Sequence, residues 1–137
     1  MGVFLDTSVP IRAQRTAMSY ANMQRRIFNI VGDDDLGTSS IVMTELIHGV
    51  YRAKTPDIWQ RRQDFVAQFL QDVAVYSYEL ATAELAGRIG GEQASAGRTV
   101  PPVDLMIGAT ALSLGYSIMT TNLDHFRLIP NLTVIPF

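Results

Sequence analysis

The chain opens with Val3-Phe4-Leu5-Asp6-Thr7-Ser8, in which three apolar residues are followed at once by three polar ones. A short apolar run of this kind predicts a buried strand of a parallel sheet, and its abrupt end predicts that Asp6 lies at the carboxyl edge of that sheet. Ser8 and Pro10 suit the start of a helix, because proline is favoured in the first helical turn. The stretch therefore predicts a strand, a polar edge and a helix in direct succession.

Apolar strands and amphipathic helices alternate along the rest of the chain. Strands are expected at residues 36–40, 73–76, 117–121 and 132–135, helices at 20–31, 41–51, 58–70, 79–96 and 103–114, and a turn or short helix at 122–127. This alternation predicts an α/β fold, a three-layer α/β/α sandwich with a central, mostly parallel sheet. With 47% hydrophobic residues, we expect residues 1–137 to form a single domain. In such folds, ligands bind beyond the carboxyl ends of the strands.

The composition excludes several classes of protein. Because the chain has no cysteine, it has no disulfide framework, no thiolate metal site and no cysteine nucleophile. The net charge of −2, from 11 basic and 13 acidic residues, provides no global attraction for nucleic acid, so an RNA substrate would need metal ions and a local basic patch. Since there is neither a basic leader nor an apolar run of about 18 residues, we expect a cytoplasmic protein outside the membrane.

Acidic residues recur just after expected strands or in the first turns of expected helices. These residues are Asp6, Glu45, Asp104 and, after the polar run 120–122, Asp124. Carboxylates that converge repel one another unless a divalent cation lies between them. Oxygen-rich sites of this kind suit Mg²⁺ or Mn²⁺, which can activate water for hydrolysis of a phosphodiester. The pattern therefore indicates metal-assisted hydrolysis that needs no protein nucleophile.

Four blocks of sequence resemble PIN-domain proteins, and especially the VapC-type toxins of bacterial type II toxin–antitoxin pairs. The blocks are Phe4–Ser8, Met43–Gly49, Pro102–Ala111 and Thr120–Phe126, the last followed by Ile129-Pro130. They occur in the expected order, and the resemblance spans nearly the whole chain. It implies a PIN-like fold and a Mg²⁺-dependent endoribonuclease acting on transfer RNA or other RNA, with Mn²⁺ as the alternative metal. It also implies a homodimer and a small cognate antitoxin protein as inhibitor.

The resemblance assigns catalytic roles to individual residues. Asp6 and Asp104 would be the main metal ligands, and Glu45 would complete the acidic set directly or through water. Thr7, Ser8 and Thr121 would be supporting hydroxyls. The last block departs from the acidic quartet of many relatives: Asn122 stands where an Asp is common, and Asp124 follows two residues later. Both residues stay candidates for the fourth catalytic position.

Each acidic residue also has an ordinary structural interpretation. Asp6 could cap the helix that follows it, and the helix dipole is a sufficient reason for an acid at Asp104. Glu45 could belong to a solvated helix face. For Asp6, the presence of the other blocks makes the interpretation as a helix cap much less favoured.

Other polar side chains leave two interpretations open or favour a structural role. Four basic residues lie close in sequence around a loop: Arg52, Lys54, Arg61 and Arg62. They could contact RNA phosphates or form a solvated helix face. His48 and His125 are separate and lack the i, i+4 partner of helical zinc sites, so packing or surface roles are favoured. The run Asp33-Asp34-Asp35 is interpreted as a solvated turn.

Two other functions would fit parts of this sequence. A phosphatase of the haloacid-dehalogenase type also begins with a strand ending in Asp, but it requires a second Asp where this chain has Ser8. A catalytically silent PIN-like module that acts through a protein partner would be favoured by the loss of a key acid. Because Asp6, Glu45 and Asp104 are all present, the sequence favours the enzyme.

Overall fold

The computed structural model describes residues 2–137. At its centre lies a five-stranded parallel sheet with the strand order β3-β2-β1-β4-β5. The central strand is β1 (Gly2–Leu5), with β2 (Asp35–Ser39) and β3 (Ala74–Tyr76) on one side of it. On the other side lie β4 (Ser117–Thr120) and β5 (Val134–Pro136). All four neighbouring pairs are parallel, including Phe4 opposite Gly37 and Ile118.

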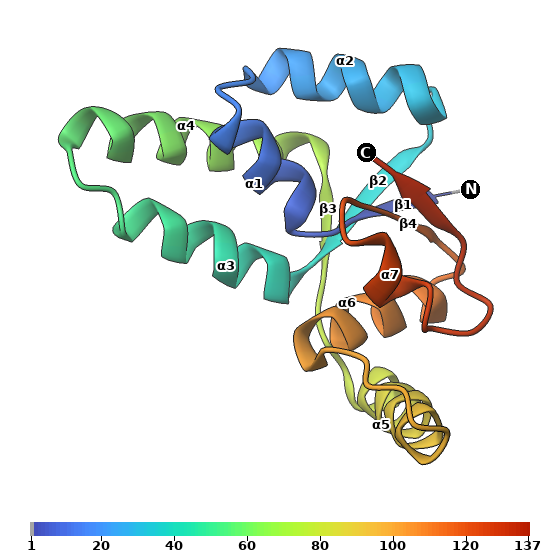
Figure 1. Ribbon diagram of the computed structural model, residues 1–137. Coiled ribbons are helices and arrows are strands. Elements are labelled where there is room, and N and C mark those ends of the chain that lie inside the picture. Colours follow the sequence, from blue (N-terminus) through green and yellow to red (C-terminus); the bar gives the residue numbers. More distant parts are fainter. Residues whose placement is uncertain (1) are drawn as a thin grey trace.

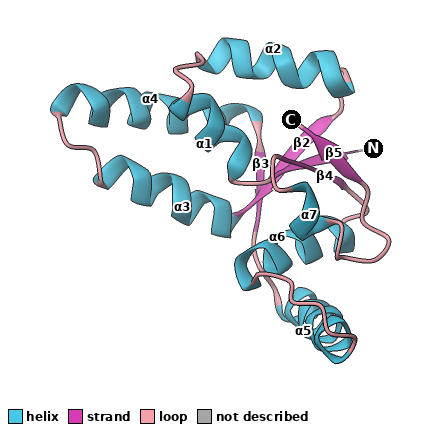
Figure 2. Cartoon of the chain, in the orientation of Figure 1, coloured by secondary structure: helices cyan, strands magenta, loops and turns pink. Residues whose placement is uncertain are grey.

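Helices cover both faces of the sheet and confirm the predicted three-layer α/β/α sandwich (Figures 1 and 2). In chain order they are α1 (Ser8–Arg15), α2 (Tyr20–Val31), α3 (Ser40–Tyr51), α4 (Pro56–Asp72), α5 (Leu80–Ser95), α6 (Pro102–Ser113) and the short α7 (Leu123–Phe126). The chain first passes from β1 through β2 to β3 at one edge of the sheet. It then returns to β4, beside β1, and continues to β5 at the other edge. Right-handed crossovers therefore place α1 to α4 on one face and α5 to α7 on the other.

Local sequence explains where the helices begin and end. Ser39 caps α3, because its side-chain oxygen accepts a hydrogen bond from the backbone N–H of Ile41 at 3.1 Å. α4 begins earlier than the predicted residue 58, because Thr55 caps the helix and Pro56 occupies its first turn. Gly115 follows α6 with φ +71°, the left-handed conformation expected of a glycine at this position.

The core lies between the sheet and its helices and contains the apolar residues of the decisive N-terminal strand. Val3, Phe4 and Leu5 are at most 2% exposed, and Phe69 of α4 is fully buried. Gly37 leaves room for the aromatic rings beside the strands, because a Cβ there would lie only 3.0 Å from the Tyr76 ring. Within residues 2–137, no helix is long and apolar enough to cross a membrane.

The change of direction in strand order falls between β1 and β4, which are neighbours in space. At such a switch point the loops beyond the carboxyl ends of the two strands diverge to opposite faces and leave a crevice. Asp6 follows β1 and Thr121-Asn122 follows β4, so both segments lie at this crevice. The topology therefore brings together the first and last blocks of the sequence.

Candidate active site

A cleft of about 1360 Å³ opens at the carboxyl edge of the sheet, between α1, α3 and α4. Its lining includes four of the five predicted catalytic residues: Asp6, Glu45, Asp104 and Asn122. Asp124 is exposed on α7 and does not line the cleft. The structure thus brings Asn122, rather than Asp124, to the three carboxylates.

Asp6 is the most buried of the three carboxylates, with 2% of the residue exposed. Its Oδ2 accepts hydrogen bonds from the Ser8 hydroxyl at 2.7 Å and from the Thr120 hydroxyl at 2.8 Å. The Ser8 hydroxyl oxygen in turn accepts the backbone N–H of Thr121 at 2.9 Å. These contacts join the loop after β1 to the loop after β4 and hold the Asp6 carboxylate at the base of the cleft.

The predicted supporting hydroxyls are partly corrected by these contacts. Ser8 supports Asp6, and Thr7 supports Glu45. From β4, however, the hydroxyl that reaches Asp6 is that of Thr120, one residue before the predicted Thr121. Thr120 is the last residue of β4 and is fully buried, whereas Thr121 already lies in the loop and contributes its backbone N–H.

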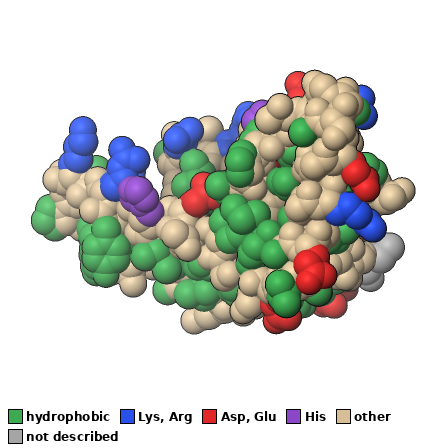
Figure 3. All heavy atoms as spheres, turned by 90° about the horizontal axis from the view of Figure 1, so that it is seen from below, with side chains coloured by type: hydrophobic (Ala, Val, Ile, Leu, Met, Phe, Trp, Pro, Cys, Tyr) green, Lys and Arg blue, Asp and Glu red, His purple; other side chains and the backbone are tan. Residues whose placement is uncertain are grey.

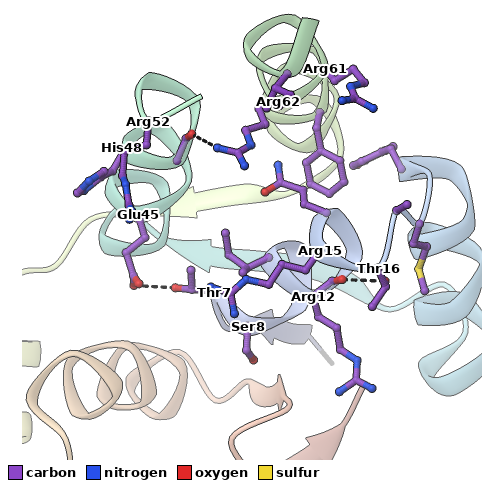
Figure 4. Close-up of a pocket in the computed structure, with 18 of the residues that line it drawn as sticks. Thr7, Ser8, Arg12, Arg15, Thr16, Glu45, His48, Arg52, Arg61 and Arg62 are labelled. Atoms are coloured by element: carbon purple, nitrogen blue, oxygen red, sulfur yellow. Dashed lines mark hydrogen bonds between the residues drawn. The ribbon is translucent and has the colours of Figure 1, made fainter. Parts of the chain in front are cut away.

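Glu45 reaches the site from the second turn of α3. Its Oε1 accepts a hydrogen bond from the Thr7 hydroxyl at 2.8 Å, and Figure 4 shows this side chain extending across the cleft toward Thr7. Val42 and Leu46, on either side of Glu45 in the sequence, are buried in the core. The burial of this apolar face therefore sets which way Glu45 points. The contact with Thr7 is more than a solvated helix face would require.

Asp104 lies in the first turn of α6, as predicted, with 16% of its side chain exposed. Its Oδ2 lies 2.6 Å from Nδ1 of His125 on α7. His125 is exposed, which fits the expected surface role, and its ring also contacts a carboxylate of the site. His48, the other histidine, lines the cleft on α3.

Each of the three carboxylates is held through one oxygen and leaves the other oxygen without a protein donor. The bonded oxygens are Oδ2 of Asp6, Oε1 of Glu45 and Oδ2 of Asp104. In the described part of the chain, no buried polar side-chain atom lacks a hydrogen-bond partner, so the second Asp6 oxygen must reach the solvent of the cleft. The site therefore presents several carboxylate oxygens that are free to bind another group.

The electrostatics of the site are unfavourable without a cation. Burial raises the pKa of Asp6 above its ordinary value of 3.8; the hydroxyls of Ser8 and Thr120 oppose this shift, and the charge of Asp104 adds to it. Burial also raises the pKa of Glu45, although this side chain is more exposed, and the charges of Asp6 and Asp104 add to the shift. Converging carboxylates, two of which have a raised pKa, are a donor set suited to a divalent cation.

The carboxylates are not packed tightly around one point. Within residues 2–137, no three acidic or imidazole side chains are grouped closely enough to hold one metal ion together. At least one of the three would therefore act on a shared ion through water or after rotation of its side chain. Mg²⁺ commonly keeps several water ligands and binds through one or two carboxylates, so this spacing is compatible with it.

Basic side chains surround the rest of the cleft. Six of the 11 Lys and Arg residues line it: Arg12, Arg15, Arg52, Lys54, Arg61 and Arg62. Four of the 13 acidic residues do so: Asp6, Glu45, Asp64 and Asp104. The cleft thus carries a formal charge of +2, while the other five basic and nine acidic residues give the remainder −4. In Figure 3, Lys and Arg gather in the half of the view at left, and most acids lie at right.

The predicted RNA-contacting residues divide into two kinds. Arg62 is half-buried, and its Nη1 donates to the backbone carbonyl of Gly49 at 2.6 Å, so it ties α4 to α3 (Figure 4). Arg52, Lys54 and Arg61 are exposed and line the cleft. These three are therefore available to a ligand, whereas Arg62 has a structural partner.

The structure also reveals residues that the sequence interpretation missed. Arg12 and Arg15 lie on α1, on the same face as Ser8, because residues four and seven positions apart share one side of a helix. The spacing 8, 12, 15 was therefore a usable signal once a helix was expected after Pro10. His125 carried no such signal, since its contact with Asp104 spans 21 positions between two elements.

The family profile, the similar sequences and the similar structures agree with one another. The family profile described as PIN domain matches residues 3–131. The tRNA(fMet)-specific endonuclease VapC of Shigella flexneri is 34% identical over 94 residues, which are 69% of this chain and 69% of that protein. The structure of DNA-bound VapBC from Salmonella typhimurium aligns with a TM-score of 0.82 and 29% identity, covering 99% of this chain and 98% of that one. VapBC2 from Rickettsia felis, bound to a DNA fragment from its promoter, shares the fold with a TM-score of 0.84 and 22% identity, covering 99% and 98%.

Proposed function

The chain belongs to the PIN-domain family, and on that premise we propose that it is a metal-dependent endoribonuclease, the toxin of a VapBC-type toxin–antitoxin pair. One observation carries the proposal: Asp6, Glu45 and Asp104 line one cleft, and each keeps one carboxylate oxygen free of protein donors. The 34% identity to an endonuclease of Shigella flexneri supports the nuclease activity. The test is cleavage of RNA by the purified protein with and without divalent metal.

Mg²⁺ fits the donor set, and Mn²⁺ is the alternative. The free oxygens of Asp6 and Asp104 would hold it, with Glu45 acting directly or through water. All are hard oxygen donors, which these two ions prefer. Burial, and to a lesser extent charge repulsion, raises the pKa of Asp6 and Glu45, and a cation would relieve both effects. When bound, such a cation supplies Lewis acidity for phosphodiester hydrolysis and neutralises charge on the leaving oxygen.

The chain's own residues position the reacting groups. The Ser8 and Thr120 hydroxyls fix one Asp6 oxygen, so the other oxygen keeps a constant direction toward the cleft. The Thr7 hydroxyl fixes one oxygen of Glu45 in the same way. Asn122, at the mouth of the cleft, supplies an amide that can contact a phosphate or a water molecule. Fixed groups of this kind lower the cost of aligning a water molecule with the scissile phosphate.

The basic part of the cleft is the path proposed for the RNA backbone. Arg12, Arg15 and Arg52 are exposed beside the carboxylates, and each can neutralise a phosphate. RNA would then lie along α1 and α3, with the scissile phosphate at the acidic end. The acidic remainder of the surface would repel RNA and confine binding to this cleft.

Arg15→Gln is expected to weaken RNA binding several-fold at about 0.1 M salt and to reduce the log–log salt slope of the binding constant by about 0.7. Arg15 is exposed and has no polar partner in the described part of the chain, so the fold should be unaffected. The matched control is Arg88→Gln on α5, an exposed helical arginine outside the cleft. Binding would be measured on the Asp104→Ala background, which prevents cleavage. Equal losses in both variants would contradict the proposed path.

The partners are proposed from the similar toxin–antitoxin structures. We propose that a small antitoxin protein inhibits the enzyme, since the similar Salmonella and Rickettsia structures are VapBC assemblies, and that the toxin forms a homodimer. The proposed substrate is transfer RNA or another RNA, and the proposed location is the cytoplasm. A neighbouring reading frame for a small DNA-binding protein would be the expected gene for the antitoxin.

A further inference from the structure

We propose that His125 is a positioning residue that orients Asp104 for metal binding. The proposal rests on the proposed function, because it treats Asp104 as a metal ligand. Nδ1 of His125 lies 2.6 Å from Oδ2 of Asp104, within hydrogen-bond distance. The imidazole is 47% exposed and does not line the cleft, so it acts on the site through Asp104 and not on the substrate.

The position of His125 is set by the docking of α7 on α6. Phe126, the next residue, is fully buried. A Cβ at Gly108 of α6 would lie 3.2 Å from the Phe126 ring, so the glycine allows α7 to approach α6 closely. Gly108 lies one helical turn after Asp104 on the same helix. Two adjacent residues of α7 therefore contact α6 at two points one turn apart, His125 at Asp104 and Phe126 at Gly108.

The segment after α7 is held independently. The Gln93 side chain of α5 donates from Nε2 to the backbone carbonyl of Leu128 at 2.7 Å. Ile129 is 2% exposed, and its burial in the core anchors the same segment. Packing and a hydrogen bond hold residues 126, 128 and 129, directly after His125, so the place from which its ring reaches Asp104 does not depend on that contact. The imidazole is therefore a preformed donor that constrains the carboxylate.

The consequence for Asp104 follows from the charges around it. Asp6 and Glu45 repel Asp104, so an unrestrained carboxylate would rotate away from them toward solvent. A hydrogen bond from His125 to Oδ2 opposes this rotation and leaves Oδ1 free to bind a metal ion. Hydrogen-bond partners that orient ligands in this way typically contribute about 10- to 100-fold to metal affinity or activity.

The test is calorimetric titration of Mn²⁺ into the full-length protein without RNA. His125→Leu removes the donor, and we expect about tenfold weaker Mn²⁺ binding. His125→Asn places an amide N–H near the position of Nδ1 and should bind Mn²⁺ within about threefold of the wild type. Arg127→Gln, an exposed residue at the end of α7, is the control and should match the wild type. At saturating Mn²⁺, the kcat of His125→Leu should recover while the KM for RNA stays unchanged.

The outcomes separate this proposal from the proposed function. Wild-type affinity in His125→Leu, or equal weakening in His125→Asn and His125→Leu, would overturn the positioning role and leave the nuclease intact. Absence of Mn²⁺ binding to the wild type would overturn both. His125→Ala repeats the loss of the donor without adding an apolar side chain, and should weaken binding as His125→Leu does. Thermal unfolding of each variant checks that the docking by Phe126 is preserved.

Discussion

Asp6→Asn is expected to reduce RNA cleavage by about 100-fold or more while leaving the fold intact. Asp6 supplies a charged oxygen at the base of the cleft, and stabilisation of the transition state by a metal held there amounts to several kcal/mol, or roughly two to three orders of magnitude in rate. Asparagine has nearly the same shape, and its amide oxygen can still accept the hydroxyls of Ser8 and Thr120. The variant should therefore lose the charge without losing these contacts.

The same variant should be more stable than the wild type in EDTA, and the difference should grow with pH. Because burial raises the folded-state pKa of Asp6 above the ordinary 3.8, the folded protein holds this proton more tightly than the unfolded chain. This tighter proton binding stabilises the folded wild type at low pH. The stabilisation is lost as the pH rises through the folded-state pKa of Asp6. Asparagine does not titrate.

Urea unfolding at about pH 4.5 and pH 7.5 in EDTA measures this difference in free energy of unfolding. A larger advantage of Asp6→Asn at the higher pH is expected, because only the wild type must then ionise a buried carboxylate. A pH-independent difference, or cleavage retained by the variant, would contradict the assigned role. Without the charge of Asp6 the pKa of Glu45 is raised less, so Glu45 changes the comparison in the same direction.

Phe126→Ala is expected to lower the free energy of unfolding by about 3–5 kcal/mol and the Tm by roughly 10 °C. Phe126 is fully buried against α6, and its removal leaves a cavity where α7 docks. Cleavage should fall as well, since α7 carries His125. Thermal and urea unfolding measure the loss.

Leu80→Ala on α5 is the matched control for this core substitution. Leu80 is 76% exposed, so the change should stay within about 0.5 kcal/mol of the wild type. If Phe126→Ala were as mild as Leu80→Ala, α7 would not depend on this contact. The account of His125 as a preformed donor would then fail too.

Much of the fold could be predicted because its signals are local. The alternation of apolar strands with amphipathic helices indicated the parallel sheet, and the polar residues after Leu5 indicated its carboxyl edge. The bounds were less accurate. β5 is Val134–Pro136 instead of 132–135, and α4 extends from Pro56 to Asp72 instead of 58–70, since caps and packing decide the final residues.

The gathering of Asp6, Glu45 and Asp104 in one cleft was predictable for a physical reason. Parallel strands end at one edge, and residues that follow strands or begin helices meet there. What the sequence could not supply was long-range register. Whether Thr120 or Thr121 reaches Asp6 depends on where β4 ends, a difference of one residue. The contact of His125 with Asp104 depends on the docking of α7 on α6, which no local pattern encodes.

The most direct test of the central claim is cleavage of total bacterial RNA by the purified protein, beside the Asp104→Ala variant. Each protein would be assayed with Mg²⁺, with Mn²⁺ and with EDTA, and the products separated and sequenced. We expect discrete fragments that require the metal and are absent with Asp104→Ala. Identical products from the two proteins, or no cleavage by either, would contradict this expectation and favour a PIN-like module that acts only through its protein partner.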